Sequence, residues 1–245
     1  MPCLTSRFPK QARFSHTMWL RSAFGLCILV GLMLIGSSGV RAETNKQCLA
    51  TWKKPVAAIK RVSAKPTINN RKTSKQIEIV ARKSRYVTPK GYKRLLGLNN
   101  ATVARNIGIS TTYRKQKNGQ SCIRLEKVTL EFGLSKTDIY VDRKYRKSSC
   151  AYKATLEHEN EHTKINQKVI DEYAPLLKRE LKERAAEIKP FLTRDPDLAI
   201  QSIINRISFD LKPLIEEFSE ARQKANDVID TKQSYRETNR KCRDW

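Results

Sequence analysis

The hydrophobic and polar positions of this chain follow two different periods. Between residues 76 and 141 apolar and polar residues tend to alternate, which is the pattern of half-buried β-strands. From about residue 150 onward apolar residues instead recur every three or four positions, which is the pattern of amphipathic helices. We expect strands over 76–81, from Ile107 or Gly108 to Tyr113, over 122–132 and over 137–141.

Two local signals refine the strand region. Asn118-Gly119 is a strong hairpin signal between the second and third expected strands. The alternation slips between Leu125 and Val128, which predicts a β-bulge. Residues 43–75 look irregular, and short helical turns are expected at 58–62 and 92–98.

The helical region predicts two long helices. The first begins near Cys150 after a cap at Ser148 or Ser149, and it reaches about Tyr173. Pro175 should bend or restart it, and the apolar stripe resumes over 176–188. The second runs over about 198–229, with Asp195 or Asp197 as its cap and a kink at Pro213.

The expected fold class is therefore α+β, with a small, mainly antiparallel sheet followed by a long helical hairpin. Residues 43–149 form the β-rich part and residues 150–245 the helical part, and we expect 43–245 to fold as one domain.

Residues 1–42 have the composition of a signal peptide. They hold five basic and no acidic residues, and the apolar run from Ala23 to Ile35 is short for a membrane span. Val40-Arg41-Ala42 is a small-x-small cleavage pattern, so we expect cleavage after Ala42 and a periplasmic or secreted protein. Translation from Met18 would give a more ordinary leader, and the alternative is an anchor helix that is not cleaved.

Four cysteines remain after the leader, and an even number in an exported chain predicts two disulfides. Spacing alone leaves three connectivities open. We expect Cys122 to pair with Cys150 and Cys48 with Cys242, the second bond joining the two ends of the mature chain.

The charge is concentrated in one half of the chain. Residues 43–150 contain 26 basic and 6 acidic residues, a net of +20, whereas residues 151–245 contain 18 of each. A basic half favours anionic partners such as cell-envelope polymers or a membrane surface. Aromatic residues are few there and no nucleic-acid motif is present, which disfavours nucleic acid. The alternative is a basic surface that serves solubility alone.

The strongest chemical signal is His158-Glu159-Asn160-Glu161-His162, which reads H-E-x-x-H. His158 and His162 lie on one face of a helix and can bind one zinc ion. Glu159 is placed to act as a general base toward an attacking water. The alternatives are a solvated surface pair, or two core histidines that only form hydrogen bonds.

Two histidines leave a catalytic zinc site one protein ligand short. The only other histidine, His16, lies in the leader. Counting back along the returning helix places residues 224–228 opposite the motif. The candidates for the third ligand are therefore Asp227, inside that window, and Glu217, which is closer to the apolar stripe.

The run Ser149-Cys150-Ala151-Tyr152, followed by Leu156 to His162 and preceded by the short strand at Ile139-Tyr140-Val141, resembles exported bacterial proteins predicted to be zinc-dependent proteases. The resemblance covers mainly residues 120–175. It implies His158 and His162 as zinc ligands, Glu159 as the base, and a peptide or protein substrate. The same five residues also satisfy H-x-x-E-H, which would make Glu161 the base.

The sequence thus favours an exported zinc metallopeptidase. The main alternative is a non-catalytic envelope protein that binds an anionic polymer or lipid through its basic half. A third is a protein that binds a partner through its helices.

Overall fold

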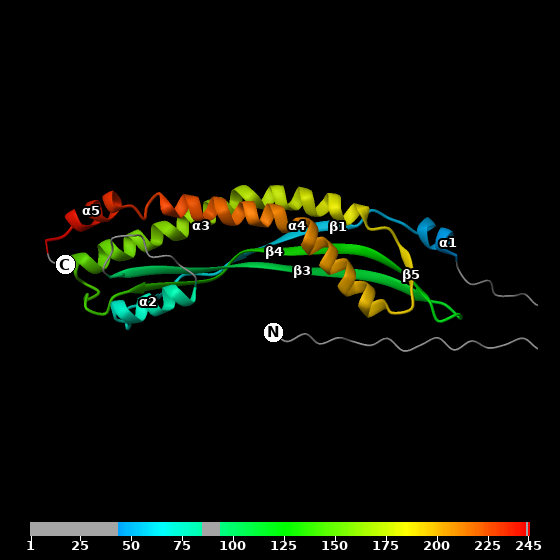
Figure 1. Ribbon diagram of the computed structural model, residues 1–245, viewed down its shortest axis with the longest axis horizontal. Coiled ribbons are helices and arrows are strands. Elements are labelled where there is room, and N and C mark those ends of the chain that lie inside the picture. Colours follow the sequence, from blue (N-terminus) through cyan, green and yellow to red (C-terminus); the bar gives the residue numbers. More distant parts are fainter. Residues whose placement is uncertain (1–43, 85–93, 244) are drawn as a thin grey trace, which may run out of the picture. The chain divides into compact units, whose positions relative to one another are not determined.

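The computed structural model describes residues 44–84, 94–243 and 245. A five-stranded sheet is built around the long strand β4 (Ser121–Val141), and β3 (Gly97–Lys115) pairs with it antiparallel along its whole length (Figure 1). Successive segments of the other side of β4 pair with β5 (Phe191–Thr193), β1 (Val56–Ser63) and β2 (Thr67–Asn69). Strands β1 and β2 run parallel to β4, whereas β5 is antiparallel.

The predicted fold, a small, mainly antiparallel sheet followed by a helical hairpin, is therefore wrong, although the class is α+β. Two of the four strands that pair with β4 are parallel to it, and both come from residues 43–75, where the sequence predicts irregular structure. The helical turn predicted at 58–62 is wrong too, because these residues lie in β1. In the chain, β5 lies between the two long helices and pairs with β4. The helices therefore do not follow a completed sheet as a simple hairpin.

The strand predicted over 76–81 is also wrong, because these residues lie in helix α2 (Ser74–Lys83). Thr73 caps the helix, and it exchanges hydrogen bonds with Gln76 in a capping box. Ile77 and Ala81, four residues apart, are buried against Leu98 and Tyr140 of the sheet. Six alternating residues also fit a strand, but the capping box and the two buried residues four positions apart are features of a helix.

The β3–β4 hairpin around Asn118-Gly119 is confirmed, and Gly119 has the positive φ of 78° that such a turn requires. The predicted bulge is confirmed too, since the register shifts between Ser110 and Thr111, opposite Glu126. The two strands predicted over 122–132 and 137–141 are one continuous strand, β4. Residues 97 and 98 belong to β3 and not to a helical turn.

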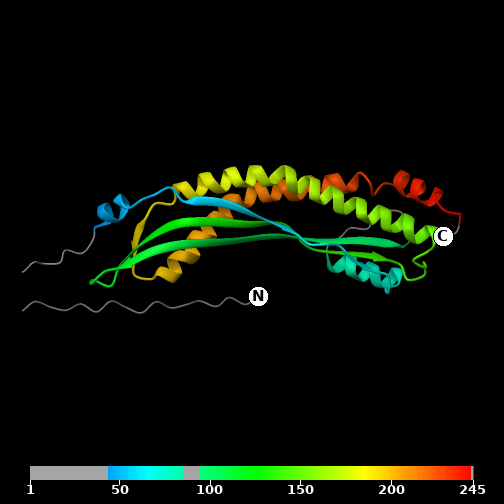
Figure 2. The same cartoon turned by 180° about the vertical axis from the view of Figure 1, so that it is seen from behind.

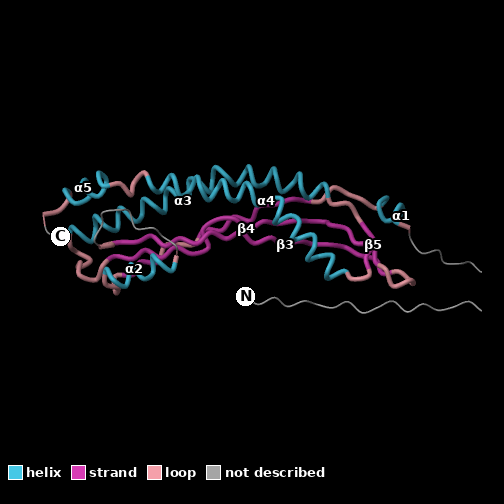
Figure 3. The backbone as a smooth tube through the Cα atoms, in the orientation of Figure 1, coloured by secondary structure: helices cyan, strands magenta, loops and turns pink. Residues whose placement is uncertain are grey.

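Helices α3 (Cys150–Glu187) and α4 (Pro196–Asp227) lie side by side over one face of the sheet, as Figures 1 and 2 both show. The predicted caps Ser149 and Asp195 are confirmed. Pro175 lies inside α3 without ending it, and Pro213 lies inside α4, whose direction changes along its length in Figure 3. The main core fills the space between these helices and the sheet, where the Phe132 and Phe218 rings meet edge to face at 5.0 Å.

Helix α2 covers the opposite face of the sheet, at the end where α3 begins (Figure 2). Two short helices lie outside this arrangement, α1 (Asn45–Ala50) before β1 and α5 (Lys232–Arg240) after α4.

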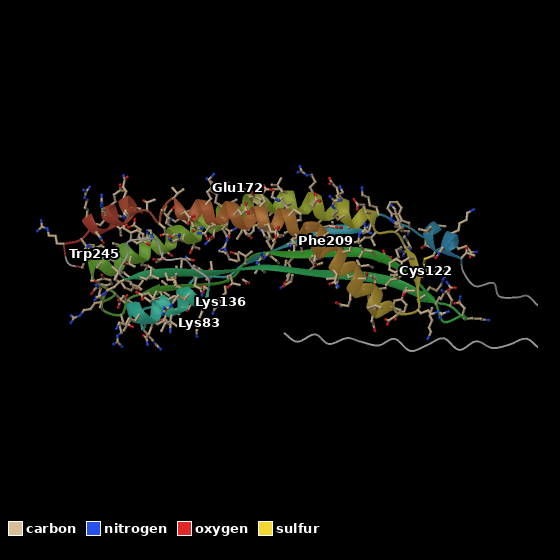
Figure 4. The ribbon with its side chains drawn as sticks, viewed as in Figure 1. Lys83, Cys122, Lys136, Glu172, Phe209 and Trp245 are labelled. Carbon is tan, nitrogen blue, oxygen red and sulfur yellow. A yellow bond between two sulfur atoms is a disulfide. The ribbon has the colours of Figure 1, made fainter. Side chains whose placement is uncertain are left out.

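Cys48, Cys122, Cys150 and Cys242 form two disulfides, as predicted, but the expected pairing is wrong. Cys48 of α1 bonds to Cys122 at the start of β4, and Cys150 at the start of α3 bonds to Cys242. Figure 4 shows Cys122 at one end of the sheet and Trp245, three residues after Cys242, at the other. The spacing could not reveal this, because α3 carries the chain along the sheet before α4 returns it.

Two disulfides agree with a protein of an oxidising compartment, outside the cytosol. The predicted signal peptide, residues 1–42, lies outside the described residues. Within the described part of the chain, no helix combines the length and the apolar character needed to cross a bilayer.

Candidate metal centre

Helix α3 presents both motif histidines on the face that it turns toward the C-terminal segment. The side chains of His158 and His162 are each 9% exposed, and their rings lie 4.9 Å apart, centre to centre. The predicted alternative of a solvated surface pair is therefore excluded. Their inward position follows from the apolar stripe of α3, because His162 precedes Val169 and Ile170 on the buried side of the helix.

A third ligand atom comes from Asp230, whose side chain is 7% exposed. Its Oδ1 lies 3.3 Å from Nε2 of His158 and 3.3 Å from Nε2 of His162. Among the described residues these three form the group of metal-ligand side chains whose donor atoms all lie within 4.8 Å of one another.

The separation of these atoms fits ligands of a shared metal ion as well as long hydrogen bonds. An N–H···O hydrogen bond is usually 2.7–3.2 Å long. Ligands about 2.0–2.1 Å from a tetrahedral metal lie about 3.3 Å from one another. The distances from Asp230 Oδ1 to His158 Nε2 and to His162 Nε2 are both 3.3 Å. Two imidazoles and a carboxylate are a donor set for zinc and also for other divalent transition metals.

The structure brings neither predicted candidate for the third ligand into this group. Asp227 accepts a hydrogen bond from Gln223 on the exposed side of α4, and Glu217 accepts one from Tyr173, eleven residues beyond His162. The helix ends at Asp227, and the turn that follows brings Asp230 back toward α3. Counting residues along an uninterrupted helix could not find it.

His162 is oriented by a hydrogen bond on its other ring nitrogen. Its Nδ1 lies 2.7 Å from Oδ1 of Asn226, which can accept the Nδ1 proton, so that Nε2 is the ring nitrogen that faces Asp230 and would bind a metal. Asn226 is itself fixed, because its Nδ2 donates to Asn166 Oδ1 at 3.0 Å and to the backbone oxygen of Arg222 at 2.7 Å. This is the outer-shell arrangement that metal-binding histidines usually have.

Tyr235 of α5 supports the other two donors. Its hydroxyl donates to Asp230 Oδ1 at 3.0 Å, and its ring packs on the His158 ring at 5.1 Å. Helix α5 buries none of its residues, and the Cys150–Cys242 disulfide ties its end to the start of α3. Sequence reasoning missed Asp230, Tyr235 and Asn226, since all three reach the site from the segment that follows the second helix or from its last turn.

Glu159 is buried beside the group. Asn99 of β3 donates its Nδ2 to the Glu159 backbone oxygen and to Thr163 Oγ1, each at 2.7 Å, and so holds α3 against the first residues of β3. Burial raises the pKa of the Glu159 carboxyl to about 7, although the charges of His162 and His158 act in the opposite direction. A carboxyl that titrates near neutral pH suits a general base.

The electrostatics of His162 also bear on metal binding. Burial by itself lowers the pKa of the imidazole, but the hydrogen bond to Asp230 and the charges of Glu159 and Asp230 together raise it to about 9. Two carboxylates thus favour positive charge at this position, where a bound cation would lie.

Glu161, the base of the alternative H-x-x-E-H reading, is not part of the site. Its side chain is 48% exposed and forms an ion pair with Lys164 at 3.0 Å. The structure therefore leaves Glu159 as the acidic residue of the motif that can act there.

Two cavities meet at the site. One, of about 130 Å³, is mainly polar and reaches the β3 edge, Glu159, His162 and the end of α4. The other, of about 100 Å³, is more apolar and extends from His158 to Leu95, Leu96 and Trp245. Three residues line both of them: Gly97, Glu159 and Tyr235. The two cavities are therefore adjacent, with these three residues between them.

Comparison of the chain with protein-family models, with curated proteins and with solved structures found no match. The resemblance to exported zinc-dependent proteases therefore stays a prediction, and the functional argument depends on the geometry of the site.

Proposed function

We propose that this protein is an exported zinc-dependent peptidase that hydrolyses a peptide or amide bond. The observation that carries the proposal is the convergence of two imidazole nitrogens on one carboxylate oxygen, at distances typical of ligands around a tetrahedral ion, beside the buried Glu159. Three protein ligands with one open position are usual for catalytic zinc.

The residues of the chain have separable roles in this proposal. A zinc ion bound there would act as a Lewis acid, which polarises a carbonyl group and lowers the pKa of water. Glu159 accepts the proton of the attacking water and passes it to the leaving amine. Asn226 and Tyr235 keep the ligand atoms in place. The two cavities receive the parts of the substrate on either side of the cleaved bond.

Export is part of the same proposal. The leader-like residues 1–42 and the two disulfides support secretion to the periplasm or beyond, with cleavage after Ala42. Mass spectrometry of the protein recovered from an expressing bacterium would show a mature chain that begins at Glu43.

Metal analysis of the purified mature protein tests the enzyme. We expect near-stoichiometric zinc in the wild type and in Glu159→Gln, and loss of zinc in His158→Ala, His162→Ala and Asp230→Ala. Hydrolysis of a casein substrate should require zinc and disappear in Glu159→Gln. Zinc retention in His158→Ala, or hydrolysis by Glu159→Gln, would show that the proposed mechanism is wrong.

One observation favours a second candidate, a non-catalytic protein that binds an anionic polymer or lipid of the envelope. Four basic side chains, Lys75, Arg94, Arg143 and Lys144, line an open groove near the start of α2, which Glu78 and Asp142 also border. Binding to anionic vesicles that weakens steeply with salt, and weakens in Lys75→Gln with Arg143→Gln but not in His158→Ala, would support this candidate.

A further inference from the structure

Arg222 lines the polar cavity together with Glu159 and His162. Within the described ranges, its guanidinium forms no ion pair and no hydrogen bond. The hydrogen bond that the residue does make is through its backbone oxygen, which accepts from Asn226 Nδ2. Burial and the nearby positive charge of Arg105 both lower the pKa of Arg222. Arg222 is thus a partly buried cation at this cavity that no described residue neutralises.

Such an arrangement costs free energy unless something compensates it. Moving a guanidinium out of water is unfavourable when no anion accompanies it, and a second arginine nearby adds repulsion. The group that best offsets both is a carboxylate, which the planar guanidinium can bind through two parallel hydrogen bonds. Because the described residues supply none here, the natural source is a ligand in the cavity.

The position of Arg222 relates that ligand to the metal group. Arg222 and Asn226 lie four residues apart on one face of α4, about 6 Å along the helix axis. Asn226 contacts His162 directly, at 2.7 Å. An extended peptide advances about 3.3 Å per residue, so about two residues span this distance.

We propose that Arg222 binds a carboxylate of the peptide substrate, about two residues from the bond that is cleaved. The inference depends on the proposed peptidase function and adds a substrate class to it. The carboxylate is either an acidic side chain or the free C-terminus of the substrate, and the experiment below separates the two.

Metal-binding peptides serve as probes in a competition assay on the zinc-loaded protein. Mercaptoacetyl dipeptides place their residues on the leaving-group side of the metal, and peptide hydroxamates place them on the acyl side. Each set compares a glutamate with a glutamine at the same position, and the thiol set also compares a free C-terminus with an amide. We expect one carboxylate probe to bind roughly tenfold or more tightly than its amide, and Arg222→Gln to abolish that difference.

Arg206→Gln is the matched control, because Arg206 lies on the same helix but is exposed and already paired with Glu187 and Asp210. It should keep the carboxylate preference. A preference that survives in Arg222→Gln, or no preference in any pair, would overturn the inference. If neither thiols nor hydroxamates bind to the wild type, the metal centre itself is wrong, and the two failures are thereby distinguished.

A second experiment, on the metal-free protein, tests carboxylate binding by Arg222 independently of the metal. The wild-type protein should melt at a higher temperature in sodium acetate than in sodium chloride of equal ionic strength, and Arg222→Gln should lose this difference. In chloride, Arg222→Gln should melt at or above the wild-type temperature, because an unpaired, partly buried charge is removed. A lower melting temperature in chloride, together with no acetate effect in the wild type, would show that Arg222 is structural and the inference is wrong.

Discussion

Gly97 and Glu159 are in such close contact that only a glycine leaves room for the carboxylate. A Cβ on Gly97 would lie 2.4 Å from Glu159 Oε1 and 2.7 Å from Thr155 Cγ2. The backbone of Gly97 cannot easily withdraw, because it pairs with Val141 at the end of β4. The first residue of β3 thus determines where the proposed catalytic base lies.

Gly97→Ala should therefore displace the Glu159 carboxylate while leaving the metal ligands in place. We expect zinc content to remain near the wild-type value and peptidase activity to fall by roughly 10²-fold, in the range that general-base catalysis contributes. Gly108→Ala on the same strand is the control, since a Cβ there would meet nothing within 4 Å. Equal activity in Gly97→Ala and the wild type would mean that Glu159 is not the base.

The contrast between His162 and Asp230 shows how far the sequence predicts this site. His158 and His162 lie on one helix, so their spacing alone places them together. Asp230 joins them only because α4 ends at Asp227 and the chain turns back toward α3. No local sequence pattern predicts this tertiary arrangement. The close approach of Gly97 to Glu159 cannot be predicted from the sequence either, since it depends on the packing of β3 against α3.

The fold, like the site, is predictable from the sequence only where the signals are local. The long helices and the β3–β4 hairpin were predictable because caps, periodicity and Asn118-Gly119 are local signals. The parallel pairing of β1 with β4 joins Val56 to Lys127, and nothing in either segment specifies its partner. Short alternating segments such as 76–81 fit both a strand and a helix until their neighbours decide.

Asn226→Ala should weaken zinc binding without removing a ligand. The substitution deletes the oxygen that can accept the His162 Nδ1 proton, so the ring loses its fixed orientation and tautomer. We expect the zinc dissociation constant, measured by competition with a chromogenic chelator, to rise roughly 10–100-fold. Gln223→Ala, one turn earlier and exposed, should leave it unchanged. An unchanged constant in Asn226→Ala would exclude this role.

Zinc affinity should rise with pH well above the range of an ordinary histidine. The pKa of His162 in the metal-free protein is raised from 6.5 to about 9, so zinc must displace a proton from it throughout that range. We expect the apparent affinity to increase about tenfold per pH unit between pH 7 and pH 9. An affinity that is constant above pH 7 would show that His162 is neutral before the metal binds.

The stability of the metal-free protein should change with pH in the opposite direction. A raised pKa stabilises the fold below the unfolded value and loses that contribution as the pH passes the folded value. The contributions of Glu159 and His162 should therefore fade as the pH rises through about 7 and about 9, respectively. The increase in melting temperature that zinc produces should consequently be larger at pH 9 than at pH 7.

Breaking the Cys150–Cys242 disulfide should weaken the metal centre although neither cysteine touches it. The bond ties the end of α5 to the start of α3, and α5 buries none of its residues. Asp230 and Tyr235 lie on this otherwise weakly held segment, so its release raises the entropy cost of bringing Asp230 to the histidines. We expect Cys150→Ser with Cys242→Ser to raise the zinc dissociation constant at least tenfold and to leave the far-UV circular dichroism largely unchanged.

The second disulfide supplies the control for this prediction. Cys48–Cys122 joins α1 to the start of β4, at the opposite end of the sheet from Trp245 (Figure 4), which lines the same cavity as His158. Replacing Cys48 and Cys122 by serine should lower the melting temperature, because the unfolded chain loses a constraint, but should leave zinc affinity within about twofold of the wild type. If both pairs of substitutions weaken zinc binding equally, the effect comes from global stability and the C-terminal segment has no special role in holding Asp230.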